Sequence, residues 1–164
     1  MKKIFLLRHA KSSWKDSSLS DFDRPLNNRG KHDAPIMAER FLKRNIPVDL
    51  IVSSSSRRTA DTAKIFSDVI QSKSPIRESD DLYEASSYDI LNCIHQIEDN
   101  YSNIVVVCHN PGITNLSNYL SEHFIENIPT TGIVGYSFEK NWKDIKENSC
   151  TLIFFDYPKK NWGN

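Results

Sequence analysis

Histidine and arginine residues follow three apolar segments of this sequence, and their chemistry sets them apart from the rest of the chain. They are Arg8 and His9 after the segment 4–7, Arg57 and Arg58 after the segment 49–53, and His109 after the segment 103–108. A neutral imidazole nitrogen can attack phosphorus and form a covalent intermediate. The planar guanidinium group of arginine matches phosphate oxygens, often with two parallel hydrogen bonds. These residue types therefore indicate a phosphate site with a histidine nucleophile.

The adjacent residues Arg57 and Arg58 can be interpreted in two ways. Both are expected in or near the first turn of a helix, where a cation opposes the helix dipole by about 0.3–1 kcal/mol. A bound anion would remove this cost. The alternative is a pair of surface arginines. Three further histidines have no ligand-like spacing and are expected to be ordinary surface or helix residues; they are His32, His95 and His123.

The sequence lacks the residue spacing that other classes of phosphatase, nucleotide-binding protein and hydrolase require. A cysteine phosphatase built on Cys108 would need an arginine six positions further on, where the sequence has Thr114. The sequence has neither a GxxxxGK[ST] nucleotide loop nor a GxSxG nucleophile elbow. Cys93, Cys108 and Cys150 are far apart and form no CxxC pair, which argues against a disulfide framework or a structural zinc site. We therefore expect no metal site and no cofactor.

Apolar periodicity predicts alternating strands and helices. The expected strands are 3–8, 49–53, 75–78, 103–108, 133–139 and 150–156, and the expected helices are 28–44, 56–70, 87–98 and 110–124. A long polar loop, about 10–26, joins the first strand to the first helix. Pro35 should kink that helix or mark a late start. Asn110 is expected to cap the last helix, with Pro111 at its first position.

This alternation predicts an α/β fold, a three-layer α/β/α sandwich with a mostly parallel central sheet. The 164 residues fit one domain, 1–164. In such sheets a ligand binds outside the carboxyl ends of the strands. The sequence therefore predicts that Arg8, His9, the pair Arg57–Arg58 and His109 meet at one edge of the sheet.

Composition and charge limit the possible partners. The chain is 38% hydrophobic and 26% charged, and its 21 basic residues balance 21 acidic ones. A zero net charge gives no reason to expect binding to nucleic acid or to an anionic membrane. Four apolar residues near the N-terminus are too few for a signal peptide or a membrane span, so a cytoplasmic protein with reduced thiols is expected. The sequence does not assign an oligomeric state. Trp14, Trp142 and Trp162 are candidate exposed aromatics for a partner surface, with core packing or chance exposure as the alternatives for each.

Several motifs resemble one known family in order and spacing. "LLRHAKS" resembles the Arg-His signature of the histidine phosphatase superfamily, which includes the phosphoglycerate mutases. Two segments resemble its short SixA-type branch: "DFDRPLNNRG" (21–30) and "TTGIVGYSFE" (130–139). "SSSSRRTADTA" (53–63) resembles the segment with the second phosphate arginine, which places it at Arg58 rather than Arg57, and "VVVCHNPGI" (105–113) resembles the strand with the second histidine. Together these segments span most of the chain. The resemblance implies a phosphoglycerate mutase-like fold and a metal-independent phosphatase with a phosphohistidine intermediate.

The resemblance also implies roles for individual residues. His9 becomes the phosphohistidine, Arg8 and Arg58 hold the phosphoryl oxygens, and His109 contacts the phosphoryl group. Arg24 either adds a further phosphate contact or fixes the turn that runs from Asp21 to Pro25; the two alternatives are equally weighted.

The presence of Glu84 is compatible with either a phosphohistidine or a phosphomonoester substrate. In "DLYEAS" (81–86) it falls where many relatives carry the carboxylate that protonates a leaving oxygen, and its alternatives are a helix-capping or a surface glutamate. The main hypothesis is a SixA-type protein phosphohistidine phosphatase, since the short connection 79–87 leaves no room for a lid. The alternatives are a small-molecule phosphomonoesterase and a non-catalytic phosphate-recognition module. The expected partner is thus a phosphorylated protein or a small phosphoester.

Overall fold

The computed structural model describes residues 1–160, which form a six-stranded sheet in the order β3-β2-β4-β1-β5-β6. The strands are β1 (Lys2–Arg8), β2 (Leu50–Ser54), β3 (Ile76–Ser79), β4 (Asn103–Cys108), β5 (Ile133–Phe138) and β6 (Thr151–Asp156). The strands β3, β2, β4 and β1 pair in parallel, whereas β5 and β6 pair antiparallel. The mostly parallel sheet expected from the sequence is confirmed.

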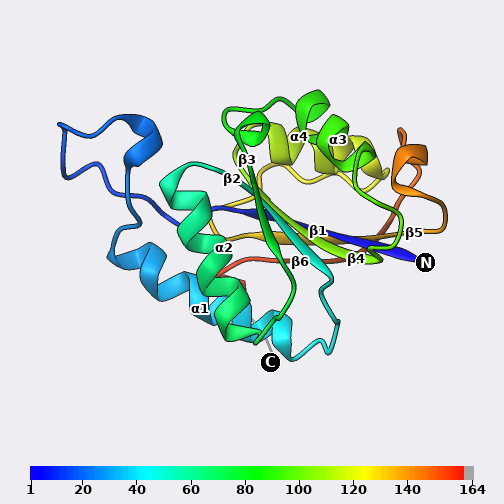
Figure 1. The fold of residues 1–164 in the computed structure, drawn as a ribbon, viewed down its shortest axis with the longest axis horizontal. Coiled ribbons are helices and arrows are strands. Elements are labelled where there is room, and N and C mark those ends of the chain that lie inside the picture. The colour runs from blue at the N-terminus through cyan, green and yellow to red at the C-terminus, as the bar shows by residue number, and fades with distance from the viewer. Residues whose placement is uncertain (161–164) are drawn as a thin grey trace.

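Within residues 1–160, four α-helices cover the two faces of this sheet (Figure 1). They are α1 (Asn28–Leu42), α2 (Arg57–Val69), α3 (Ser87–His95) and α4 (Gly112–Leu120). Three short 3₁₀ helices are η1 (Asp21–Asp23), η2 (Asp80–Leu82) and η3 (Trp142–Asp144). The helices α1 and α2 share one face, and α3 and α4 share the other, which gives the expected three layers.

The central strand β1 packs against both helical layers. Ile4 and Leu6 lie in the apolar cluster with α3 and α4, whereas Phe5 and Leu7 lie in the cluster with α1 and α2. This division follows from the alternation of side chains along a strand. All four side chains are at most 1% exposed, which explains why the strand reads as an unbroken apolar run.

The start of α4 differs from the sequence prediction. Pro111 occupies the N-cap position and the helix begins at Gly112, so Asn110 does not cap it. The side chain of Asn110 is engaged elsewhere: its Oδ1 accepts a hydrogen bond from Thr114 at 2.6 Å, and its Nδ2 donates to Asn127 at 2.8 Å. These contacts tie the loop after β4 to the segment before β5 and leave the cap position to proline.

The first helix begins where the sequence places it. Asn27 caps α1, because its side chain accepts a hydrogen bond from the Gly30 N–H at 2.8 Å. Pro35 therefore lies inside the helix, and the alternative of a late start is wrong.

Two helices end earlier than expected. The helix α3 ends at His95 rather than near residue 98, and α4 ends at Leu120 rather than near residue 124. After α4, Ser121 has φ −144° and ψ 166°. This extended conformation cannot continue a helix.

The three tryptophans have different surroundings. Trp14 is 75% exposed, as expected. Trp142 is fully buried and donates its indole N–H to the Tyr101 carbonyl at 2.9 Å, so core packing, not a partner surface, is the correct alternative for it. Trp162 lies outside the described residues.

None of the described helices has the length and apolar character that a membrane crossing requires.

Candidate active site

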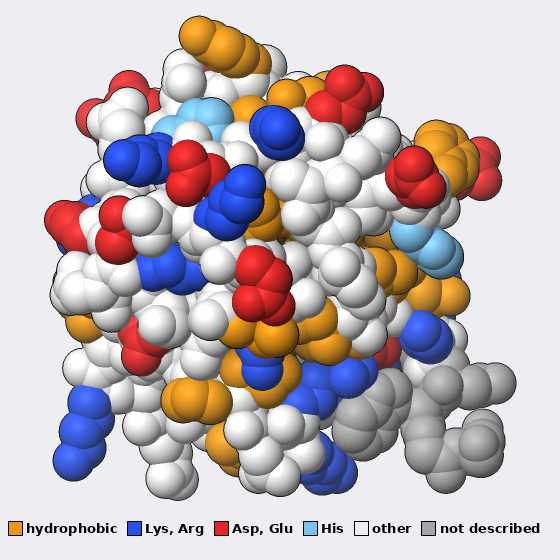
Figure 2. Space-filling model, turned by 90° about the vertical axis from the view of Figure 1, so that its right-hand side faces the viewer, with side chains coloured by type: hydrophobic (Ala, Val, Ile, Leu, Met, Phe, Trp, Pro, Cys, Tyr) orange, Lys and Arg blue, Asp and Glu red, His pale blue; other side chains and the backbone are white. Residues whose placement is uncertain are grey.

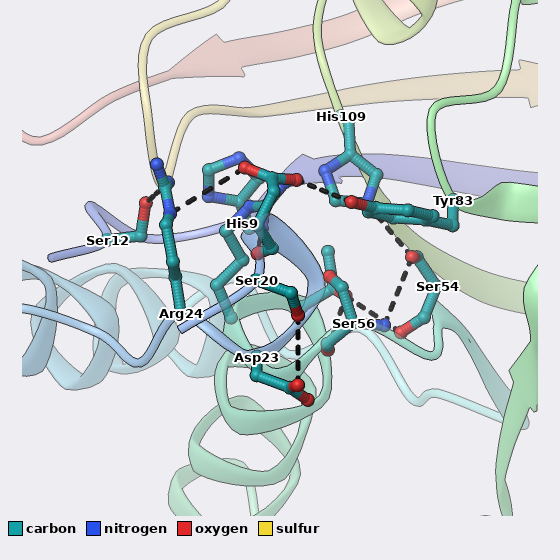
Figure 3. A network of polar contacts seen from close by, with 12 residues as sticks. His9, Ser12, Ser20, Asp23, Arg24, Ser54, Ser56, Tyr83 and His109 are labelled. Atoms are coloured by element: carbon teal, nitrogen blue, oxygen red, sulfur yellow. Dashed lines mark hydrogen bonds and ion pairs between the residues drawn. The ribbon is translucent and has the colours of Figure 1, made fainter. Parts of the chain in front are cut away.

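The two histidines named by the sequence leave the sheet side by side. The parallel register pairs Arg8 at the end of β1 with Cys108 at the end of β4. The next residue of each strand is a histidine, and the ring centroids of His9 and His109 are 5.2 Å apart. Ser54, at the carboxyl end of β2, lies beside His109 (Figure 3). Three neighbouring strands thus bring their ends to one site, as predicted.

His9 has a defined tautomer. Its Nδ1 lies 2.7 Å from the Ala10 carbonyl oxygen, and a carbonyl can only accept, so Nδ1 carries the proton. The ring is 8% exposed, and burial lowers the pKa of His9 to about 3, with smaller contributions in the same direction from His109, Arg58 and Arg8. His9 is therefore neutral at pH 7, and its Nε2 carries a free lone pair. This is the state that a nucleophilic imidazole requires.

His109 is also buried and neutral. It is 5% exposed, and burial lowers its pKa to about 4, with the charges of Arg58 and Arg8 acting in the same direction. Its Nε2 shares a hydrogen bond of 2.9 Å with the Ser54 hydroxyl. This bond fixes the orientation of the ring next to His9.

Two arginines with unpaired donors, Arg8 and Arg58, line the same cavity as the histidines. Arg58 is 6% exposed and occupies the second position of α2, and Arg8 is half-buried and donates to the Ile128 carbonyl at 2.9 Å. The Nε atoms of both are buried and have no hydrogen-bond partner within the described part of the chain. A buried unpaired donor costs about 1–3 kcal/mol. A bound anion would satisfy both donors.

Arg24 lies at the other side of the site. It is 6% exposed, and its Nη2 donates to the Ser12 hydroxyl (Figure 3). The guanidinium lies 3.4 Å from the centre of the Trp14 ring. Its Nε and Nη1 have no hydrogen-bond partner among residues 1–160, although Nε lies 3.7 Å from Asp21 Oδ1. Arg24 also closes the turn, because its backbone N–H donates to the Asp21 carbonyl. Its side chain lines a cavity together with His9 and Arg58, and a contact with phosphate stays a prediction.

Two cavities meet at the nucleophile. The site cavity, of about 340 Å³, is lined by Arg8, His9, Asp21, Arg58, Glu84, Ala85, His109, Asn110 and Pro111. The loop cavity, of about 270 Å³, is lined by Arg8, His9, Lys11, Ser12, Trp14, Asp21, Arg24, Arg58 and Thr130. A larger cavity of about 630 Å³ beside β3 and α3 contains neither histidine. Unpaired cationic donors and the lowered histidine pKa values single out the site cavity as the place for chemistry.

Comparison with protein families identifies the kind of enzyme. Residues 4–91 match the model of the histidine phosphatase superfamily, branch 1. The chain belongs to this superfamily. It is a phosphatase, and the residues that the match covers include His9, Arg24, Arg58 and Glu84.

Relatives of this histidine phosphatase cover nearly its whole length. The uncharacterized protein Rv1276c of Mycobacterium tuberculosis is 30% identical over 93% of this chain and 100% of its own length. A crystal structure of a protein assigned as the phosphohistidine phosphatase SixA of Agrobacterium tumefaciens is 27% identical, with a TM-score of 0.80 over 96% of this chain and 98% of that one. A protein assigned in the same way, from Nakamurella multipartitia, has the same fold, with 22% identity and a TM-score of 0.82 over 97% of each chain.

Within this histidine phosphatase, Glu84 lies where it can meet a substrate. It is exposed, lines the site cavity, and has φ 53°. It does not cap a helix, because Ser86 and Asp89 form the capping box of α3. The helix-capping alternative is therefore wrong.

Arg57 lies apart from the residues that line the site cavity. Its side chain is 54% exposed and its Nε lies 3.9 Å from Asp61. Of the two adjacent arginines, Arg58 lines the site cavity with both histidines, and it is the one to which the resemblance assigns the phosphate contact. Among residues 1–160, no three His, Cys, Asp or Glu side chains are grouped as metal ligands.

Two residues of the site were missed. Asp21 Oδ2 accepts hydrogen bonds from Arg58 Nη2 at 3.0 Å and from the Tyr83 hydroxyl at 2.5 Å. Asp21 belongs to the segment 21–30, and an acidic residue among cations could have indicated a partner for Arg58. Tyr83 gave no such signal, because its contact with Asp21 spans 62 residues of sequence.

Proposed function

We propose that this histidine phosphatase is a SixA-type enzyme that hydrolyses phosphohistidine in a protein, with His9 as the nucleophile. The observation that carries the proposal is the state of His9: Nδ1–H is held by the Ala10 carbonyl, and the ring is neutral. His9 lines one cavity with Arg8 and Arg58, whose Nε atoms have no hydrogen-bond partner in the described chain. The 27% identity to the Agrobacterium protein over nearly both full lengths supports the SixA-type assignment.

The surrounding residues stabilise the transferred group in this proposal. The unpaired N–H groups of Arg8 and Arg58 bind the phosphoryl oxygens, and Arg24 adds a contact from the loop cavity. His109 contacts the phosphoryl group from its neighbouring strand. Preorganised donors of this kind stabilise the charge of the transition state without reorganisation.

The reaction takes two steps. His9 Nε2 forms a bond to phosphorus while the bond from phosphorus to the leaving nitrogen breaks. The group that leaves is a neutral imidazole, because the other ring nitrogen of the substrate histidine can carry a proton near neutral pH, where an imidazole has its pKa of about 6.5. Water then attacks phosphorus, the bond to Nε2 breaks, one water proton passes to solvent, and phosphate leaves with His9 restored.

The same proposal includes the remaining expectations from the sequence. Residues 1–164 form one domain that acts in the cytoplasm without a metal or cofactor. Its substrate is a phosphorylated protein, which a site bordered by the short connection from η2 to α3 can admit.

Glu84 supports a second candidate, a small-molecule phosphomonoesterase. An exposed carboxylate that lines the site cavity can protonate an oxygen leaving group, which an alkyl phosphate needs and a phosphohistidine does not. The third reading, a phosphate-recognition module without turnover, predicts binding of phosphate with no covalent intermediate.

Acid-labile labelling tests the proposal. The protein is mixed with a ³²P-phosphohistidine protein, quenched in base, and examined for label that is stable in base and lost in acid. Wild type should take up label and release phosphate, and His9→Ala should do neither. Labelling of His9→Ala would overturn the nucleophile assignment. Unlabelled wild type that still binds phosphate would favour the recognition module.

A further inference from the structure

Arg58 is held by one residue of the long loop. Its Nη1 donates to the backbone carbonyl of Asp21 at 2.7 Å, and its Nη2 donates to Asp21 Oδ2 at 3.0 Å. Asp21 begins η1, in the loop between β1 and α1, whereas Arg58 lies in the first turn of α2. Two bonds to two separate acceptors fix both the place and the in-plane rotation of the guanidinium.

Tyr83 in turn holds the Asp21 carboxylate. Its hydroxyl donates to Oδ2 at 2.5 Å. The Tyr83 ring packs edge-on against Phe22, the neighbour of Asp21, with ring centroids 5.1 Å apart, and against His109, with centroids 5.6 Å apart. The Tyr83 ring therefore links η1 to His109, which follows β4, and the Tyr83 hydroxyl orients the Asp21 carboxylate.

Asp21 leaves Arg58 free to bind a substrate. Arginine has five N–H donors, and the two bonds to Asp21 use two of them. The buried Nε of Arg58 has no partner in the described part of the chain. Asp21 therefore holds the guanidinium without filling the donors that a phosphoryl group needs.

We propose that Asp21 is a positioning residue for phosphoryl transfer, which holds Arg58 in the orientation that the phosphoryl oxygens require, and that Tyr83 positions Asp21. This inference rests on the proposed function, because it concerns the reaction that Arg58 assists. Asp21 lines both the site cavity and the loop cavity, so its charge also acts on any anion bound there.

The charge of Asp21 gives this role a recognisable signature. The Tyr83 hydrogen bond lowers the pKa of Asp21, and Arg58 and Arg24 add to the effect, so the carboxylate is ionised at pH 7. A carboxylate beside a bound phosphate repels it. Removal of the Asp21 charge should slow phosphoryl transfer, because Arg58 loses its orientation. It should not weaken the binding of phosphate, because the repulsion between the carboxylate and the phosphate is lost as well.

A double-mutant cycle tests the inference. Asp21→Asn is made in wild type and in Arg58→Ala, and kcat is measured with p-nitrophenyl phosphate or phosphohistidine protein, with enough enzyme to follow slow turnover. Asp21→Asn should lower kcat about tenfold in wild type and less than twofold in Arg58→Ala. The inhibition constant of inorganic phosphate should stay level or fall. Tyr83→Phe should lower kcat about threefold with the same pattern.

Neighbouring residues supply matched controls. Asp23→Asn changes a carboxylate of the same 3₁₀ helix that bonds to Ser20, and Tyr88→Phe changes a tyrosine that is 69% exposed. Both should keep wild-type kcat. An unfolding midpoint for each variant shows whether it is folded. If Asp21→Asn fails to fold, Tyr83→Phe in both backgrounds carries the same comparison.

The outcomes separate this inference from the proposed function. An equal fall of kcat in both backgrounds, or an equal fall in Asp23→Asn, would overturn the positioning role while the enzyme remains a phosphatase. A rise of the phosphate inhibition constant along with the fall in kcat would point to a general loss of site structure and would also overturn it. Failure of the proposed function would show earlier, as turnover that survives in His9→Ala.

Discussion

At the scale of single residues, His9, the proposed nucleophile, depends on a neighbour that the sequence motif does not explain. The Ala10 carbonyl fixes the His9 tautomer, and the Ala10 N–H donates to Thr62 Oγ1 at 2.9 Å. Thr62 in turn bonds to the Arg58 carbonyl at 2.7 Å. The threonine of the segment 53–63 therefore connects the phosphate arginine of α2 to the peptide that sets the proton on His9. The sequence predicted His9 and Arg58, but not this connection.

Under the proposed function, Glu84 is the residue whose loss should affect oxygen and nitrogen leaving groups differently. Because an alkoxide needs a proton and an imidazole does not, we expect Glu84→Gln to lower kcat for alkyl phosphates by about 100-fold. Hydrolysis of a phosphohistidine protein should change by less than about threefold. Steady-state rates on the two substrate classes with the same protein preparations measure this difference.

The control for this experiment is Glu147→Gln, which changes an exposed carboxylate that does not line the site cavity. It should leave both activities at the wild-type level. Equal losses of both activities in Glu84→Gln would contradict a role that depends on the leaving group.

At the scale of elements, the packing of α4 onto the preceding loop places Glu84. Gly112 begins α4, and a Cβ built there would lie 2.2 Å from the Ala85 carbonyl oxygen. This close approach of two backbones needs a glycine and explains why the helix starts at Gly112. Side-chain preferences at Asn110 and Pro111 predicted an earlier start, because they describe an isolated helix end rather than a contact with another segment.

We expect Gly112→Ala to push the Ala85 peptide away and to lower the free energy of unfolding by about 1–3 kcal/mol, the usual cost of overpacking. Turnover of alkyl phosphates should fall as well, because Glu84 moves with Ala85. Urea unfolding measures the first effect. Asn115→Ala, at an exposed position of the same helix, is the control and should keep or slightly raise stability. An unchanged unfolding midpoint in Gly112→Ala would show that the two backbones can separate at no cost.

At the scale of the whole molecule, the apolar periodicity of the sequence predicted the layered α/β fold and the edge of the sheet at which the site lies. Unbroken apolar strands imply a sheet covered on both faces, and parallel strands bring Arg8, His9 and His109 to one edge. It could not predict contacts between distant loops, such as those of Asp21 with Arg58 and Tyr83, which span 37 and 62 residues. Burial of a single aromatic, such as Trp142, likewise depends on the tertiary structure.

On the face of the molecule drawn in Figure 2, the distribution of charged side chains agrees with the balanced composition of the chain. Figure 2 shows acidic and basic side chains interspersed on the face at the right-hand side of Figure 1, near the N-terminus. This face has no broad region of one sign. The concentrated positive charge instead lies at the buried arginines of the site, where it suits a phosphate rather than a polyanion.

The histidines of the site make the stability of the whole fold depend on pH. Burial lowers the pKa of His9 to about 3 and of His109 to about 4, whereas both have a pKa near 6.5 in the unfolded chain. Below pH 6.5 the unfolded chain therefore binds more protons than the folded one, and stability is lost as the pH falls. Each histidine should contribute a loss of about 1–2 kcal/mol between pH 7.5 and pH 5.

Urea unfolding at these two pH values, in buffers free of phosphate, measures the loss. Phosphate must be absent because any ligand of the folded state adds its own stabilisation. His9→Gln and His109→Gln should each show a smaller loss than wild type, since each removes one buried group that the unfolded chain can protonate. His32→Gln, which changes an exposed histidine of α1, should keep the wild-type slope. Equal slopes in all four proteins would mean that other groups set the acid sensitivity, and that the two histidines of the site are not held neutral by the fold.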